Sequence, residues 1–188
     1  MLIKLLPDSE KTLLLDLATL LALSDKPLLW DGKTKDELRT DYDLNTLSIQ
    51  HGALEKELLS ELEQSVKTFE LPIMGASTAL IESKLTEKLK NFTLLKIDAV
   101  ETRVQAANAV LNTLLKDKQS DDPSIPKIIL LQLILIALRD GHISNIEWLL
   151  LKEIQLHYQL QDFIFKDLLE RAEALNSEIS KTLALVLE

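Results

Sequence analysis

Leucine dominates this chain: it fills 44 of the 188 positions, whereas aromatic residues make up 4% and there are only 4 Gly and 5 Pro. Sandwiches and barrels need turn-forming residues at each corner, and this chain holds too few of them. Leucine without many β-branched or aromatic companions favours helices instead. A hydrophobic fraction of 46% also excludes a disordered chain. We therefore expect an all-α protein, folded as a single globular bundle over residues 1–188.

The charge balance is acidic, with 30 Asp and Glu residues against 21 Lys and Arg residues and a formal net charge of −9. Proteins that bind nucleic acid draw most of their affinity from Lys and Arg, so no nucleic-acid partner is expected. The same balance argues against a basic face that binds anionic lipid. It permits cations and basic partner surfaces, although solubility alone also accounts for it.

Cysteine is absent, which excludes disulfides, thiolate nucleophiles and Cys-ligated zinc. The first residues show no secretion signal. The longest apolar runs, Leu13–Leu23 and Ile128–Leu138, are 11 residues each, whereas a membrane span needs about 20. We therefore expect two core helices and a cytoplasmic protein that is not an integral membrane protein.

Hydrophobic periodicity and capping residues predict seven to nine helices. The predicted helices are 8–24, a short one opened by the capping box of Thr34 and Glu37, 44–69 as one helix or two, 77–90, 94–116, 128–138, 144–158, 162–175 and 177–187. The segment 116–126 is polar and holds two prolines, so it is expected to be a loop. No segment alternates apolar and polar residues convincingly, and no strand is expected.

Two stretches of the chain are alike. Each has an apolar helix, then an Asp-Gly pair, then a capping box: Asp31-Gly32 precedes Thr34 and Glu37, and Asp140-Gly141 precedes Ser144 and Glu147. Both patterns are typical of a helical hairpin with a glycine turn. The similarity suggests an internal pseudo-two-fold repeat, with halves at about 8–70 and 94–175.

The second stretch resembles the tellurite-resistance TerB-like family. Members carry an apolar helix that ends in Ala-x-x-Asp-Gly, followed by Ile or Val, a Ser or Asp cap and a Glu. The matching residues in this chain are Ala137, Asp140, Gly141, Ile143, Ser144 and Glu147. The resemblance is specific over 128–175, weaker over 8–37 and close to absent between 41 and 116.

The resemblance implies an all-helical domain without catalytic activity, alone or fused to other modules such as J-domain co-chaperones, and associated with stress responses near membranes. It also implies that acidic residues bind a divalent cation. The matched positions are Asp140 and Glu147, and the repeat adds Asp31 and Glu37, with Asp25 beside the same turn. Carboxylates on one side of a turn suit a hard cation. The alternative is purely local: Asp140 satisfies turn amides and Glu147 closes its capping box.

The sequence is compatible with three functional hypotheses. The first is a non-enzymatic TerB-like module that binds a protein partner, with dependence on a divalent cation such as Ca²⁺, Mn²⁺ or Zn²⁺. The second is a purely structural interaction protein without metal, and a homodimer is compatible with either. The third is a carboxylate-based metalloenzyme, which requires several acids that converge in a concave site. The sequence shows no phosphate-binding glycine loop, nucleophile elbow or His-Glu-x-x-His motif.

Three further features have two interpretations each. Trp30 and Trp148 lie beside the two turns, where they would serve either as anchors for a partner or as core residues. The apolar tail 183–187 can pack on the core or on another subunit. Glu153 and His157 lie four residues apart on one helix face, where a surface hydrogen-bonded pair is expected rather than a metal site.

Overall fold

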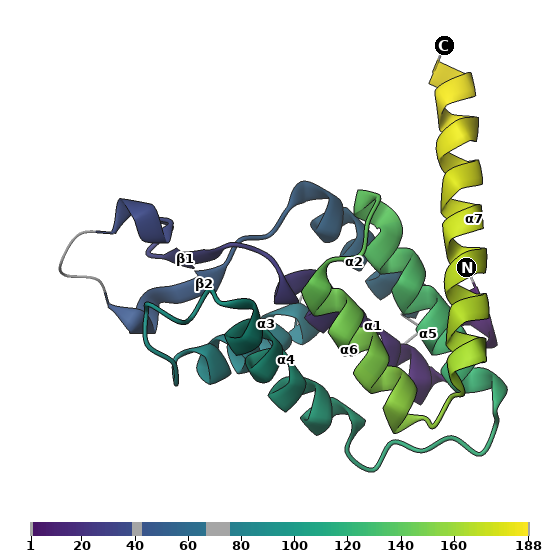
Figure 1. The fold of residues 1–188 in the computed structure, drawn as a ribbon, viewed down its shortest axis with the longest axis horizontal. Coiled ribbons are helices and arrows are strands. Elements are labelled where there is room, and N and C mark those ends of the chain that lie inside the picture. Colours follow the sequence, from purple (N-terminus) through teal and green to yellow (C-terminus); the bar gives the residue numbers. More distant parts are fainter. Residues whose placement is uncertain (1, 39–42, 67–75, 188) are drawn as a thin grey trace.

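The structure is a computed structural model that describes residues 2–38, 43–66 and 76–187 (Figure 1). Within these residues it contains seven α-helices, four short 3₁₀ helices and one pair of strands. Their bounds are η1 Leu2–Leu5, α1 Asp8–Ser24, β1 Leu28–Trp30, η2 Lys35–Glu37, η3 Leu44–Thr46, β2 Leu47–Ile49, α2 Ala53–Val66, α3 Ala76–Leu89, α4 Val100–Leu115, α5 Ser124–Ala137, η4 Leu138–Asp140, α6 Asn145–His157 and α7 Asp162–Leu187. The predicted class, an all-α globular bundle, is confirmed.

Helix α1 lies at the centre of the bundle. It contacts α2, α3, α4, α5 and α6, and Figure 1 shows these helices grouped around it. Leu14, Ala18 and Leu23 are completely buried, and of the residues between them only Asp16 is not buried. A helix that is apolar all round needs neighbours on all sides, and α1 has them. The run Leu13–Leu23 is therefore the core helix that the sequence predicts.

A small antiparallel ribbon departs from the expected all-helical pattern. Strand β1 pairs with β2 so that Leu28 faces Ile49 and Trp30 faces Leu47. These four side chains are buried, whereas Leu29 and Ser48 between them are partly exposed. The expectation of no strand was therefore wrong here, and the helix predicted from residue 44 begins only at Ala53. The predicted end of that helix, at residue 69, lies outside the described residues.

The C-terminal segment is one helix of 26 residues where two were expected. The helix continues through Asn176, whose side-chain amide donates a hydrogen bond to the Leu138 carbonyl, 3.1 Å away, on η4. The first part of α7 packs on α5 and η4, and the remainder extends beyond the body of the molecule (Figure 1). Among the described residues, no helix combines the length and the apolar character that crossing a bilayer requires.

The two Asp-Gly turns share their local chemistry but lead into helices of very different length. Gly32 and Gly141 both have positive φ, 75° and 88°, which glycine adopts without strain. Both capping boxes are present. However, the first capping box opens only the three-residue helix η2, whereas the second opens the 13-residue helix α6. The pseudo-two-fold repeat of the halves 8–70 and 94–175 stays a prediction.

Candidate functional site

The end of α1 and the turn between α5 and α6 meet at the side chain of Lys26. Its Nζ lies 3.3 Å from Oδ2 of Asp140 and 3.9 Å from Oδ1 of Asp25. Asp25 follows α1 directly, and Asp140 closes η4, so the ion pairs join two segments that are far apart in the chain. The structure thus brings two of the five predicted site residues together around an ammonium group.

We call this contact between the end of α1 and the α5–α6 turn the junction. Glu147 lies beside the junction and is 9% exposed. Its Oε2 accepts a hydrogen bond of 2.8 Å from the backbone N–H of Ser144, as the capping box predicts. Burial raises the pKa of Glu147 to about 6, the N–H of Ser144 opposes this shift, and the charge of Asp25 adds to it. A cavity of about 20 Å³ adjoins Glu147, Lys26 and Asp140, which is the space that one water molecule occupies.

Arg103 of α4 completes the junction from the inside. The side chain is buried, and its guanidinium donates to the carbonyl oxygens of Leu23, Ser24 and Lys26 at 2.7 to 3.4 Å. The Ser24 carbonyl ends α1 and has no helical partner, whereas the Leu23 carbonyl also accepts from the N–H groups of Asp25 and Lys26. Burial lowers the pKa of Arg103, whereas the charges of Asp98 and Asp25 raise it.

Asp31 and Glu37 have other contacts. Asp31 is exposed in a left-handed conformation, with φ of 51°, and its N–H donates to the Thr46 carbonyl. Glu37 is exposed, and its carboxylate accepts from the N–H and the hydroxyl of Thr34, which lowers its pKa. Within the parts of the chain that the structure describes, no three His, Cys, Asp or Glu side chains gather as a metal site would require.

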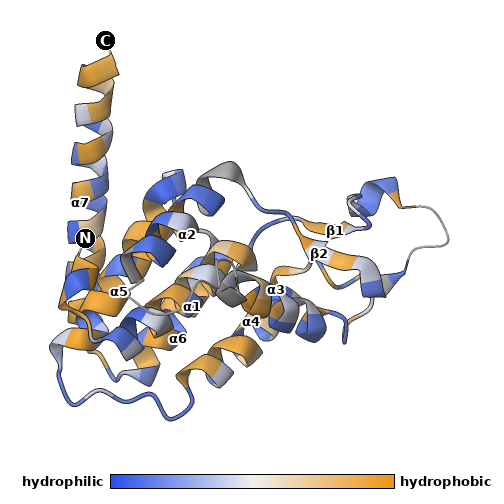
Figure 2. Ribbon diagram, turned by 180° about the vertical axis from the view of Figure 1, so that it is seen from behind, coloured by the Kyte–Doolittle hydropathy of each residue, from blue (hydrophilic) through white to orange (hydrophobic). Residues whose placement is uncertain are grey.

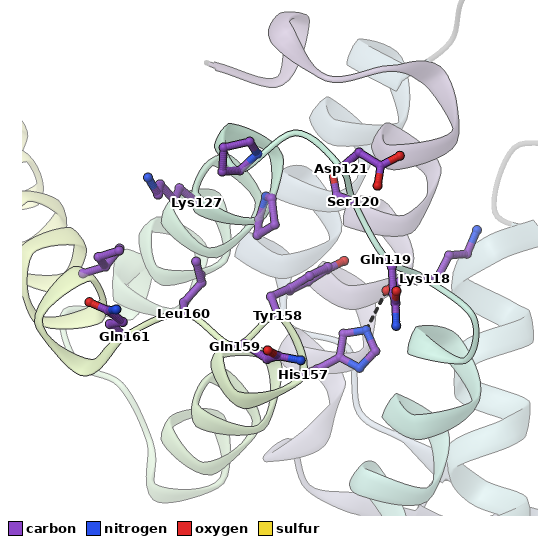
Figure 3. Close-up of a pocket in the computed structure, with 13 residues that line it drawn as sticks. Lys118, Gln119, Ser120, Asp121, Lys127, His157, Tyr158, Gln159, Leu160 and Gln161 are labelled. Carbon is purple, nitrogen blue, oxygen red and sulfur yellow. Dashed lines mark hydrogen bonds between the residues drawn. The ribbon is translucent and has the colours of Figure 1, made fainter.

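A second concave region lies between the loop after α4 and the turn from α6 to α7 (Figure 3). This pocket has a volume of about 510 Å³, within the range of small-ligand sites. Nε2 of His157 lies 2.7 Å from the carbonyl oxygen of Lys118. A carbonyl can only accept, so Nε2 carries the hydrogen and is the donor. His157 thus bonds the loop, rather than forming the expected pair with Glu153.

Tyr158 crosses the same pocket, with its hydroxyl directed toward the side formed by Ser120 and Gln119 (Figure 3). The hydroxyl oxygen is buried and has no hydrogen-bond partner in the structure. Burial and, secondarily, the charge of Glu10 raise the pKa of Tyr158 to about 12. The backbone is left-handed at Gln159, with φ of 53°. The sequence did not single out this pocket, because its residues come from a loop and two helix ends.

The exposed end of α7 is a third feature. Phe165 and Ala172 are buried near its start, but the apolar residues beyond them face solvent. Their exposed fractions are 49% for Leu175, 48% for Ile179, 55% for Leu183, 74% for Leu185, 73% for Val186 and 84% for Leu187. Figure 2 shows hydrophobic residues continuing to the end of this helix. We call residues 183–187 the α7 tip.

A groove of about 500 Å³ lies where α7 leaves the body. We call it the α7 groove, and its walls are Leu138, Gly141, His142 and Ile143 of the turn, Trp148 of α6, and Leu169, Glu173, Asn176 and Ser177 of α7. Trp148 is 39% exposed, and its ring meets Phe165 edge to face at 5.4 Å. Trp30, by contrast, is 1% exposed and belongs to the core.

Comparisons with protein-family models, with curated proteins and with solved structures returned no match to this chain. The TerB-like resemblance therefore stays a prediction that rests on the residues of segment 128–175.

Proposed function

We propose that this chain is a non-enzymatic helical module that binds a partner protein through α7. The observation that carries this proposal is the run of exposed apolar side chains on a helix that extends beyond the body. Contiguous exposed apolar surface marks interaction sites in folded proteins. An amphipathic helix with a neighbouring groove is a common arrangement for binding another helix.

The apolar face of α7 that packs on the body supports the same proposal. Phe165, Ala172 and Ile179 follow one another at seven residues, so they share a face of the helix. The first two are 1% and 0% exposed, because α5 and the rest of the body cover them, whereas Ile179 is 48% exposed. The face that packs inside the bundle thus continues outside it, where a partner supplies the missing cover.

The acidic turn supports the version of this function that needs no metal. Lys26 places its ammonium between Asp25 and Asp140, where a divalent cation would otherwise balance the acids. Glu147 is engaged by the backbone N–H of Ser144. We therefore propose that Asp25, Asp140 and Glu147 hold the end of α1 to the start of α6. The association with stress responses that the TerB-like resemblance implies remains an expectation.

The test compares proteins recovered with native and altered chains. A double variant, Leu183→Ser with Leu187→Ser, removes apolar surface from the α7 tip. Leu95→Ser is the matched control, since Leu95 is 86% exposed but lies between α3 and α4. We expect cross-linking in cells to recover a protein with the native chain and the control, and to lose it with the double variant. Identical recovery with all three chains would contradict the proposal.

A further inference from the structure

The α7 groove and the α7 tip are positioned to complement each other. The groove presents Leu138, Ile143 and the exposed part of Trp148, and it lies alongside residues 173–177. The side-chain amide of Asn176 bonds the Leu138 carbonyl and so joins the two walls. The groove is therefore a preformed recess with both apolar and polar walls, and it lies about ten residues before the tip on the same helix.

The tip offers side chains of matching character on the same face. Residues 176, 180, 183 and 187 follow one another at intervals of four, three and four, so they line one side of α7. Asn176 belongs to the groove, and Leu183 and Leu187 are 55% and 84% exposed. Leu185 is 74% exposed but lies on nearly the opposite side of the helix. One face of α7 thus carries both a recess and the leucines that could fill it.

We propose that the partner covering α7 is a second copy of this chain, with the two α7 helices packed antiparallel around Ser180. This inference rests on the proposed function and names its partner. A two-fold axis at Ser180 places residues 183–187 of each copy opposite residues 173–177 of the other. The offset between tip and groove is about 15 Å at 1.5 Å per residue. The α7 tip of each copy therefore enters the α7 groove of the other copy, which is the self-complementary contact of a closed dimer.

The charges favour this occupant over others. The whole chain carries −9, so most of its surface repels another copy. From residue 173 to residue 187, however, the charged residues are Glu173, Glu178 and Lys181, a net charge of −1, and Glu178 pairs with Lys181 at 3.7 Å. Helices that lie on membranes carry Lys and Arg on their polar face, and this segment has a single Lys. A segment with a net charge of −1 repels its own copy far less than the rest of this acidic surface does.

Sedimentation velocity of the full chain between 1 and 100 µM tests the proposal. We expect a monomer–dimer equilibrium whose dissociation constant rises at least tenfold in the double variant Leu183→Ser with Leu187→Ser. Leu185→Ser makes the same chemical change on the other side of the helix and should leave the constant within about twofold. Circular dichroism confirms that each variant is folded. A native chain that stays monomeric at 100 µM, or equal weakening by both changes, would overturn the proposal.

The absence of cysteine in the chain allows a second, geometric measurement. Ser180→Cys should form a disulfide-linked dimer on mild oxidation, because the proposed axis brings the two copies of this residue together, and Leu185→Cys should not. Equal cross-linking of both variants would contradict the antiparallel arrangement. The dimer proposal and the proposed function can fail separately. A monomeric chain that still recovers another protein through Leu183 and Leu187 would refute the dimer but not the binding of a partner through α7.

Discussion

Arg103 donates twice to the carbonyl oxygen of Ser24, from Nε at 3.0 Å and from Nη2 at 2.7 Å, although the two residues belong to different helices. The contact closes the end of the central helix from inside the core. Arg103→Met keeps much of the apolar stem but leaves buried carbonyls without donors. We expect the free energy of unfolding to fall by about 2–4 kcal/mol, measured by urea denaturation.

Two substitutions control this experiment. Arg103→Lys keeps the charge but not the planar fork of donors. It should therefore lower the free energy of unfolding, but by less than Arg103→Met does. Arg171→Met makes the same change at an exposed position of α7 and should alter stability by less than about 0.5 kcal/mol. If Arg103→Met were as mild as Arg171→Met, the capping role of Arg103 would be refuted.

Glu147 should make the protein more stable in mild acid. Its pKa is about 6 in the folded chain against 4.5 as the ordinary value, so the folded chain binds this proton more tightly than the unfolded chain. This contribution is complete below pH 4.5 and is lost as the pH rises through 6. Between these two limits the contribution of Glu147 to the free energy of unfolding changes by about 2 kcal/mol. Urea denaturation at several pH values between 4 and 7 measures it.

Glu147→Gln isolates this effect, because glutamine keeps the capping box but does not titrate. The lowered pKa values of Asp122 and Asp162 give the opposite trend, since their contribution is lost as the pH falls. The informative quantity is therefore the difference between native protein and variant at each pH. Glu153→Gln, an exposed change on the same helix, should follow the native curve. A native-to-Glu147→Gln difference that does not vary with pH would contradict the burial of Glu147.

Tyr158 gives a prediction about an unpartnered hydroxyl. Tyr158→Phe removes a buried group without a hydrogen-bond partner, so thermal denaturation should show stability unchanged or raised by up to about 1 kcal/mol. Tyr158→Ala also removes the ring that contacts His157, and it should cost about 2–3 kcal/mol. If Tyr158→Phe were clearly destabilising, the hydroxyl would have a partner such as a bound water or ligand.

The proposal that this junction needs no metal predicts a specific result in calorimetry. Titration of the native chain with Ca²⁺, Mn²⁺ or Zn²⁺ should give the same heats as titration of the double variant Asp140→Asn with Glu147→Gln. The reason is that Lys26 already balances Asp25 and Asp140. Additional heat in the native chain, lost in the double variant, would favour the cation-binding hypothesis instead.

Helix positions were largely predictable, because leucine periodicity and capping residues act within a few turns. The bounds of α1 and the capping boxes of Thr34 and Ser144 are confirmed. The β-ribbon was missed because each strand has only three residues, too few to show a period of two. Leu47 also fits the helical spacing that begins at residue 44, and only pairing with Trp30 decides between the two.

The candidate site was predictable only in part. An Asp-Gly turn suggests acidic residues at its corner, and Asp140 and Glu147 do lie near Asp25. The cation between them is a lysine that the pattern did not single out. Arg103 was not singled out by the sequence, and it is buried on α4, whereas the apolar Val100 of the same helix is 43% exposed. Contacts between distant helices determine which residues of α4 are buried, and periodicity alone does not.

The position of α1 has a consequence for how the chain acquires its fold. The helix comes first among the seven α-helices of the described residues, yet its neighbours extend to α6, which ends at His157. During synthesis, the apolar surface of Leu13–Leu23 therefore stays incompletely covered until more than a hundred further residues have been added. Prolonged exposure of apolar surface favours collapsed intermediates and aggregation. The element with the most complete burial is thus the one that most needs protection while the chain is being made.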